Sequence, residues 1–198
     1  MSGKSKISIV LASASPRRRQ LLSKAGYKFI VVKPDVDESA FSAEKNEPCR
    51  YAKILALAKA KSVAKRFPEK IVIGADTIVD FHGQIIGKPA DAKDAEKIIR
   101  KLFSGTHKVI TALAIVRLSD NLKIVEADTT IVHPKKMMEK EIAEHIRGRS
   151  WFNKAGAYAI QETGDKFVEK IEGSLTNVMG MPMELLEHLL AEIIGKKK

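Results

Sequence analysis

The apolar and polar positions of the chain follow two periods, one typical of strands and one typical of helices. Continuous apolar runs rich in β-branched residues predict buried strands, whereas apolar residues spaced three and four apart predict amphipathic helices. The helix expected at 48–66 carries basic residues on its polar face. The predicted strands are 7–12, 27–32, 71–75, 77–81, 84–87, 108–118, 122–132 and 167–171, and the predicted helices are 16–25, 48–66, 91–103, 139–147 and 182–194.

Turn residues separate these segments and indicate the fold class. At the first helix, Ser15 is a good N-cap, Pro16 suits the first helical position and Gly26 follows the end. Because helices alternate with strands, some of them joined as hairpins, we expect an α/β fold with a mixed sheet flanked by helices. No repeat or Pro/Gly-rich linker divides the chain, so we expect one domain over 1–198 with a solvated tail at about 195–198.

The chain is strongly basic, which favours an anionic partner such as a phosphate, a nucleotide or a nucleic acid. Lys and Arg number 35 and Asp and Glu 24, a formal net charge of +11. Residues 1–34 contain no carboxylate, so the excess lies at the front of the chain. Aromatic residues make up 6% and do not alternate with the basic cluster, which argues against a platform for single-stranded nucleic acid.

The cysteine content and the apolar runs indicate the compartment. Cys49 is the only cysteine, so the chain forms no intramolecular disulfide and no cysteine-based metal cage, which fits a reducing cytoplasm. The apolar runs are too short to cross a membrane. The five histidines do not have zinc-ligand spacing. We therefore expect a cytoplasmic protein that does not enter a membrane.

The turn after the first predicted strand is the first candidate site. It reads Ser13-Ala14-Ser15-Pro16-Arg17-Arg18 and begins a helix. Free N–H groups at a helix N-terminus attract an anion, and neighbouring hydroxyl and guanidinium groups add donors for phosphate oxygens. The motif fits a phosphate cradle; the alternative is an ordinary capped helix with solvated arginines.

Two carboxylates are candidates for binding a divalent cation or orienting a water molecule. Asp76 stands at the expected carboxyl end of the strand 71–75, where ligand crevices open in α/β sheets. Glu38 lies in an acidic loop. In the alternative interpretation Asp76 caps a neighbouring loop and Glu38 is solvated.

Two further segments could contact a nucleotide. Lys88, between a glycine and a proline, could be a rigidly placed phosphate ligand, although 83–89 lacks the spacing and the Ser or Thr of a P-loop. A lysine in a surface turn is the alternative. In 153–161 small residues surround an aromatic, and the Gln161 amide could contact a donor and an acceptor on a base edge. Packing is the alternative there.

Six motifs follow one another between about residues 7 and 190. They are LASASPRR at 11–18, GADTIV at 74–79, GKP at 87–89, SGTH at 104–107, KAGAYAIQ at 154–161 and GSLTNVMGMP at 173–182. In this order they resemble the Maf family, the septum-formation-associated nucleotide pyrophosphatases. The Asp76-Thr77 pair resembles the branch of that family that prefers dTTP and UTP.

The resemblance implies a fold, an activity and an assembly. The implied fold has two lobes around an elongated mixed sheet, with a cleft between the lobes, similar to the inosine triphosphate pyrophosphatases. The implied activity is hydrolysis of a nucleoside triphosphate between its α and β phosphates, which yields a monophosphate and pyrophosphate. The implied assembly is a homodimer.

The resemblance also implies roles for individual residues. Glu38 and Asp76 would be essential, with Asp76 as proton acceptor, and their hard oxygens would hold a divalent cation, Mg²⁺ or Mn²⁺. The other implied site residues are Ser13, Arg17 and Arg18 at the phosphates, the lysines Lys61 and Lys88, and Thr77 and Gln161, which together with Arg17 bear on substrate choice.

Two positions depart from the family pattern. Asn153 stands where many members have Asp, and Ala159 where many have Gly; both bear on substrate preference.

Two alternatives for the function stay open. One alternative is a house-cleaning pyrophosphatase for modified nucleotides. The other is a non-catalytic nucleic-acid-binding regulator of division, which the charge favours and which Glu38, Asp76 and the absence of a groove-reading motif disfavour.

Overall fold

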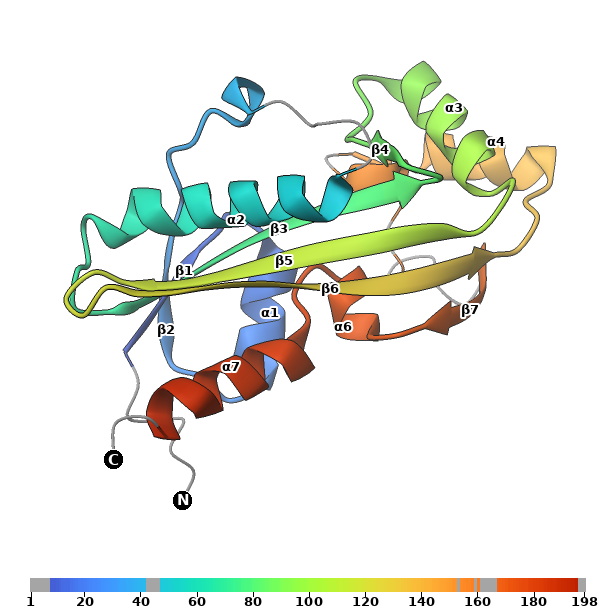
Figure 1. Ribbon diagram of the computed structural model, residues 1–198. Coiled ribbons are helices and arrows are strands. Elements are labelled where there is room, and N and C mark those ends of the chain that lie inside the picture. Colours follow the sequence, from blue (N-terminus) through green and yellow to red (C-terminus); the bar gives the residue numbers. More distant parts are fainter. Residues whose placement is uncertain (1–7, 42–46, 153, 159, 161–166, 196–198) are drawn as a thin grey trace.

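A mixed seven-stranded sheet with helices on both faces forms the structure, a computed structural model that describes residues 8–41, 47–152, 154–158, 160 and 167–195 (Figure 1). The strand order is β2-β1-β3-β5-β6-β7, and β4 pairs with β3. The strands are β1 (Ile9–Ala12), β2 (Phe29–Val32), β3 (Ile71–Phe81), β4 (Gln84–Ile86), β5 (His107–Arg117), β6 (Leu122–Pro134) and β7 (Val168–Glu172). The helices are α1 (Pro16–Lys24), α2 (Pro48–Ala64), α3 (Ala92–Leu102), α4 (Glu139–Arg147), α6 (Leu175–Val178) and α7 (Met183–Gly195), with 3-10 turns η2 (Glu38–Ala40) and η3 (Ala155–Ala157).

The expected fold class is confirmed, because the sheet combines both pairing directions. β1 is parallel to β2 and β3, whereas β3, β5, β6 and β7 pair antiparallel in sequence. Most element boundaries agree with the sequence pattern to within a few residues. The N–H of Arg18 donates to Ser15 Oγ at 3.5 Å, as an N-cap requires, and Gly26 has a φ of 79° after the end of α1.

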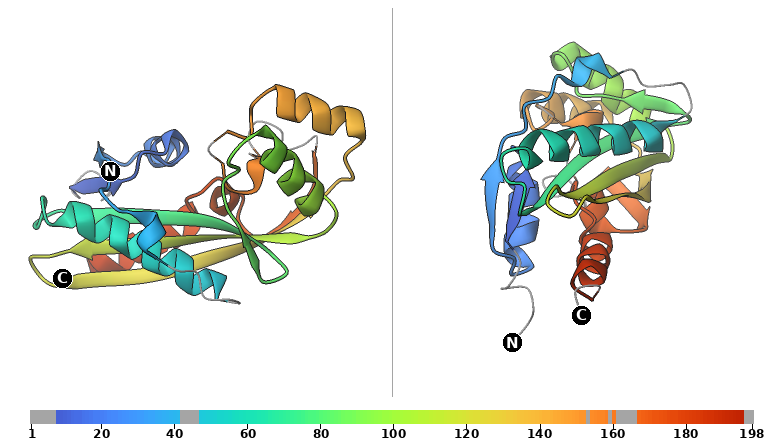
Figure 2. Two further views of the ribbon diagram at one scale, coloured as in Figure 1. Left: turned by 90° about the horizontal axis from the view of Figure 1, so that it is seen from above. Right: turned by 60° about the vertical axis from the view of Figure 1, so that its left-hand side comes forward.

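The long strands β3, β5 and β6 join two lobes (Figure 2). In the first lobe α2 packs on one face of the sheet, over a core that includes Val72 and Ala112, and α1 and α7 pack on the other face, over Ile73 and Leu113. In the second lobe α3, α4 and η3 surround a separate core. No helix in the described part of the chain is long and apolar enough to cross a membrane.

One expected boundary is wrong, because Asp76 lies inside a strand. β3 pairs with β5 without interruption from Val72 to Asp80. Gly74 and Asp76 interrupt the apolar run, but the backbone ladder with β5 does not depend on side chains and continues past them. A different strand ends near Asp76, however, because the parallel pairing of β1 with β3 stops at Ala12 and Gly74.

The end of β1 leaves part of β3 with a neighbouring strand on one side only. β4 begins to pair with β3 at Val79, so within the described residues the segment 75–78 has β5 on one edge and no strand on the other. We call this segment the open edge of β3. It lies where the core of the first lobe, which includes Ile78, meets the core of the second, which includes Val79.

Gly74 lets α2 lie close against β3. A Cβ at this position would stand 2.4 Å from the carbonyl oxygen of Ala56 and 2.7 Å from the nitrogen of Ala60. Both are backbone atoms of α2, so the helix as a whole would have to move away. The spacing between α2 and the open edge of β3 therefore depends on the missing side chain.

Gly74→Ala should reduce the free energy of unfolding by about 1–3 kcal/mol, because overpacking forces backbone shifts. The measurement is urea-induced unfolding followed by circular dichroism. Gly195→Ala is the control, since a Cβ there meets nothing within 4 Å. Equal stability of both variants would contradict the close packing of α2 on β3.

Candidate active site

Lys59 holds the two candidate carboxylates together. Its Nζ lies 2.6 Å from Asp76 Oδ1 and 2.7 Å from Glu38 Oε1. Asp76 and Gly74 are two residues apart in β3 and so face the same side, the side that α2 covers. Lys59 and Asp76 are 8% and 7% exposed, whereas the side chain of Glu38, in η2, is about half exposed at 48%. The ammonium group thus bridges a buried and a half-buried carboxylate.

The environment displaces the pKa values of these two carboxylates in opposite directions. Burial raises the pKa of Asp76 and outweighs the charge and hydrogen bond of Lys59, which lower it. Burial also opposes ionisation of Glu38, but there the hydrogen bond and charge of Lys59, with contributions from Lys88 and Arg18, prevail and lower the pKa. With its pKa raised, Asp76 is suited to accept a proton, whereas Glu38, with its pKa lowered, stays ionised.

The structure brings Lys59 rather than Lys61 to the carboxylates. Lys61 is exposed on α2, because two residues rotate a helix by about 200° and carry the side chain to the far face. We therefore replace Lys61 by Lys59 in the candidate site. A sequence signal exists, since Lys59 occupies the apolar stripe of α2 formed by Ala52, Leu55, Ala56, Ala60 and Val63. A lysine within a buried stripe requires a partner.

Lys88 approaches the cluster from the second lobe. It is exposed and follows β4, and its positive charge contributes to the lowered pKa of Glu38. The electrostatic effect of Lys88 on Glu38 supports the expectation that Lys88 belongs to the site. A phosphate group near Glu38 would lie between cations from both lobes.

The two neighbouring arginines of α1 have different surroundings. Arg18 points inward: its Nε donates to the Gly180 carbonyl at 2.8 Å, its Nη1 to the Ala75 carbonyl at 2.8 Å, and its Nη2 to Thr77 Oγ1 at 3.0 Å. Arg17 is half-buried and makes no hydrogen bond or ion pair with a residue in the described ranges. Among the described residues, no group accepts from the Arg17 guanidinium, whereas four of the five N–H groups of Arg18 have acceptors.

Ser13 and Thr77 lie beside Arg18 at the open edge of β3. Ser13 is buried, and its Oγ accepts from the N–H of Ser15 at 3.1 Å and from Arg18 Nη1 at 3.4 Å. Thr77 is half-buried and faces the side of β3 opposite Asp76. The remaining expected site residue, Gln161, lies outside the described residues, as do Asn153 and Ala159.

The carboxylate pair fits a divalent cation only in part. Among the residues that the structure describes, no group of three or more His, Cys, Asp or Glu side chains could hold a metal ion. Magnesium, however, is commonly bound by one or two carboxylates together with substrate phosphates and water. Glu38 and Asp76 supply hard oxygens of this kind, although Lys59 shares both carboxylates.

Comparison with known proteins identifies the family. The family described as "Maf-like protein" matches residues 8–193. A "dTTP/UTP pyrophosphatase" of Citrifermentans bemidjiense is 46% identical over 89% of this chain and 90% of its own length. Proteins with the same name are 45% identical in Thermoanaerobacter sp. (strain X514) and 41% identical in Dictyoglomus thermophilum, each over 92% of this chain and 94% of the relative.

Among solved structures, the Staphylococcus aureus Ham1 protein matches with a TM-score of 0.45 and 15% identity, covering 65% of this chain and 72% of that chain. The family match extends over most of the sequence and includes every residue of the candidate site. The chain belongs to the Maf family.

Lys59→Met should raise the pKa of the Asp76 carboxyl further, because it removes the charge and the hydrogen bond that lower this pKa. Lys61→Met, on the exposed face of the same helix, should leave it unchanged. The measurement is a pH titration of the Asp76 side-chain carbon by NMR. The same midpoint for Asp76 in both variants would contradict the contact between Lys59 and Asp76.

Proposed function

We propose that this chain hydrolyses a nucleoside triphosphate between its α and β phosphates, with dTTP and UTP as preferred substrates. The observation that carries the proposal is the pair Asp76 and Glu38, held on Lys59 with pKa values displaced in opposite directions. Such a pair provides one group that accepts a proton and one that remains an anion. Relatives at 41–46% identity named dTTP/UTP pyrophosphatase support the substrate class.

The cations of the site would bind the triphosphate and offset its charge. No described residue accepts from Arg17 at the start of α1, and Lys88 extends from the second lobe near Glu38. Preorganised cations of this kind stabilise charge on a transferring phosphoryl group without reorganising during the reaction. In the proposal the phosphates therefore lie across the junction of the lobes, beside the open edge of β3.

Asp76 would orient and deprotonate the attacking water. A bond forms between the water oxygen and the α phosphorus while the bond from that phosphorus to the bridging oxygen breaks. The bridging oxygen and its electron pair leave with pyrophosphate, and the water proton passes to Asp76. The raised pKa of Asp76 suits this step, because a base works best when its pKa approaches the operating pH.

A divalent cation, Mg²⁺ or Mn²⁺, belongs to the proposal as cofactor. Glu38 and Asp76 would hold it together with phosphate oxygens, and when bound it would neutralise part of the phosphate charge. The lowered pKa of Glu38 keeps this carboxylate ionised and available as a ligand. Roles for Thr77 and Gln161 in substrate choice, a cytoplasmic location and a homodimer complete the proposal.

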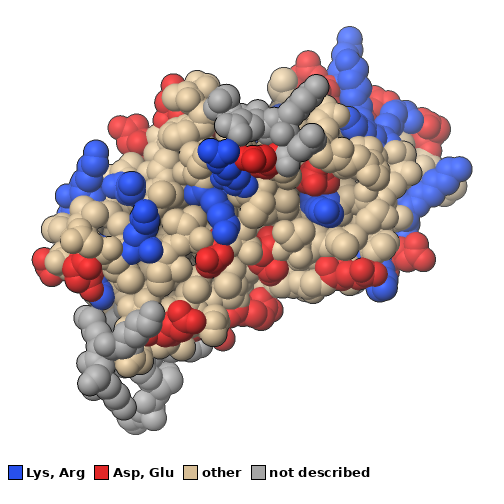
Figure 3. All heavy atoms as spheres, in the orientation of Figure 1, with Lys and Arg blue, Asp and Glu red and all other residues tan. Residues whose placement is uncertain are grey.

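The face of the molecule in view does not add support for the alternative of a nucleic-acid-binding regulator. On this face the basic side chains are interspersed with acidic ones and do not form one continuous patch (Figure 3). A backbone-binding surface would gather cations along one stripe. The other alternative, a house-cleaning role on modified nucleotides, uses the same carboxylates and differs only in the base that is accepted.

Asp76→Asn should lower the rate of pyrophosphate release by about 10²-fold or more, because the change removes the general base. The assay uses dTTP, UTP and modified triphosphates with Mg²⁺ or Mn²⁺. Asp80→Asn is the matched control: Asp80 is equally buried on the same face of β3, and asparagine keeps the oxygen that accepts from the N–H of Gly83. Near-normal turnover of Asp76→Asn would remove Asp76 from the mechanism.

Arg17→Met should raise the KM for the triphosphate by about 10–100-fold, because this factor corresponds to the free energy of one charge-assisted hydrogen bond. Arg19→Met, two residues further along α1 and exposed, should change KM little. Steady-state kinetics of both variants checks this. If the two variants have the same KM, Arg17 does not bind the phosphates.

A further inference from the structure

Two neighbouring residues of the second lobe have left-handed backbone conformations. In η3, Gly156 has a φ of 73° and Ala157 a φ of 59°. Glycine adopts such a conformation without steric cost, whereas the Cβ of alanine crowds its own backbone there. A strained residue of this kind persists only where its surroundings hold it, and such residues are concentrated at functional sites. The segment belongs to the motif at 154–161, in which the proposed function gives only Gln161 a role.

Buried side chains hold the segment 155–158 from two sides. His145 Nε2, in α4, lies 2.8 Å from the carbonyl oxygen of Ala157. Because a carbonyl oxygen only accepts, this nitrogen carries the hydrogen. The hydroxyl of Tyr158 lies 2.7 Å from Nε2 of His107, in β5. These four residues are at most 6% exposed, so the segment cannot relax without breaking two bonds for which water does not compete.

Gly156 lies in close contact with both α3 and β3. A Cβ at this position would stand 3.0 Å from Leu102 Cδ1 in α3 and 3.0 Å from Val79 Cγ2 in β3. Both side chains belong to the core of the second lobe, where close packing leaves little room to move. The position of the Gly156 backbone against this core therefore requires both the missing side chain and the positive φ.

The same segment is bonded to the turn that carries Lys88. The N–H of Gly156 donates to the carbonyl oxygen of Gly87 at 3.1 Å. On the other side of Lys88, the ring of Pro89 fixes its own φ and restricts the backbone of the residue before it. Lys88 is exposed and follows the short strand β4. Its backbone is thus restrained on both sides, and the bond from Gly156 provides one of the two restraints.

We propose that Gly156 is a positioning residue which, together with the strained Ala157, holds Lys88 in place to bind a phosphate group of the substrate. The proposal rests on the proposed function, in which Lys88 is one of the cations that bind the triphosphate. A lysine on a freely moving turn loses mobility when it binds, and this loss weakens affinity, whereas a lysine on a fixed backbone loses less. A cation that is in place beforehand also need not reorganise during the reaction.

A double-mutant cycle tests whether Gly156 acts through Lys88. The readout is the dissociation constant of pyrophosphate, measured by calorimetry, which does not require hydrolysis. Lys88→Met should raise it by about 10–100-fold, because this factor corresponds to the free energy of one charge-assisted hydrogen bond. Gly156→Ala, which displaces the turn, should raise it about tenfold. The double variant should bind pyrophosphate no more weakly than Lys88→Met alone, whereas independent effects would multiply.

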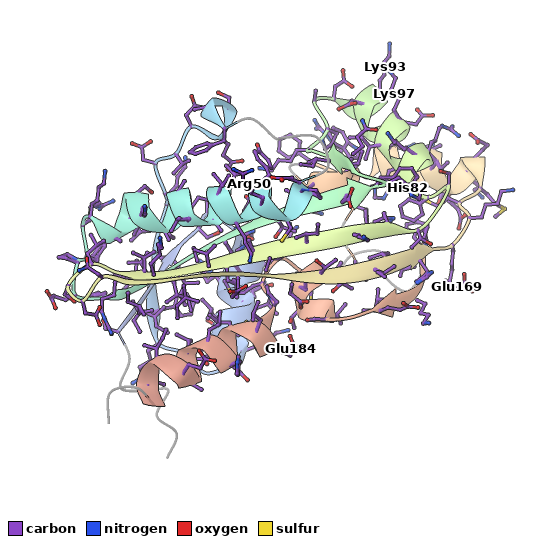
Figure 4. The ribbon with its side chains drawn as sticks, in the orientation of Figure 1. Arg50, His82, Lys93, Lys97, Glu169 and Glu184 are labelled. Atoms are coloured by element: carbon purple, nitrogen blue, oxygen red, sulfur yellow. The ribbon has the colours of Figure 1, made fainter. Side chains whose placement is uncertain are left out.

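Two variants are matched controls. Gly105→Ala also adds a methyl group to a glycine of the second lobe, but its Cβ would meet nothing nearer than Phe81 at 3.9 Å. Lys93→Met also removes an exposed lysine of that lobe, but Lys93 extends from α3 away from the sheet (Figure 4). Both variants should bind pyrophosphate as tightly as the unaltered protein does.

If Gly156→Ala does not fold, Tyr158→Phe replaces it in the cycle, because it releases the end of the segment from His107 and keeps the aromatic ring. Three results would overturn the proposal: Lys88→Met binds pyrophosphate as tightly as the unaltered protein, the variant of the segment does so, or its loss of affinity is equally large with and without Lys88. The proposed function fails separately, if the cycle gives the expected result while the unaltered protein releases no pyrophosphate from a nucleoside triphosphate.

Discussion

The ammonium group of Lys59 is the constraint on which the site depends. A buried charge is costly unless it is paired, and Lys59 finds both of its partners in segments far from it in the sequence, one in β3 and one in η2. It reaches Asp76 only because Gly74 allows α2 to pack against the strand. One nitrogen atom thus couples a helix, a strand and a loop, and the loss of this ammonium group would leave both carboxylates without the cation that they share.

A second constraint comes from the short length of β1. Where this strand ends, the backbone of β3 loses its neighbour, and the Arg18 side chain takes over by donating to the carbonyl of Ala75. The same guanidinium group binds Gly180 and Thr77, so α1 and the segment before α7 are held at one point. The residue that follows Asp76 in the chain is therefore fixed from the opposite face of the sheet.

Periodicity and turn chemistry predicted most of the fold, because they depend on local properties such as the cap at Ser15 and the positive φ of Gly26. The failures occurred where tertiary contacts decide. Asp76 ends an apolar run but not a strand, since pairing with β5 continues. Two lysines of α2 are equivalent in composition, and only the packing of the helix separates Lys59 from Lys61.

The candidate site, like the fold, was predicted only in part from the sequence. Motif order identified the family, and Asp76 stands within one of the motifs, whereas Glu38 was predicted from an acidic loop outside them. The sequence alone did not distinguish Arg17 from Arg18, because their difference depends on where β1 stops. The role of Gln161 stays a prediction.

The continuity of β3, β5 and β6 also determines how the two lobes can move. Lobes joined by a single linker rotate about a few torsion angles, whereas these are joined by three neighbouring strands whose ladders run from one core into the other. Any approach of one lobe to the other must therefore bend or twist the sheet itself. The position of Lys88 relative to the start of α1 therefore depends on the shape of this sheet.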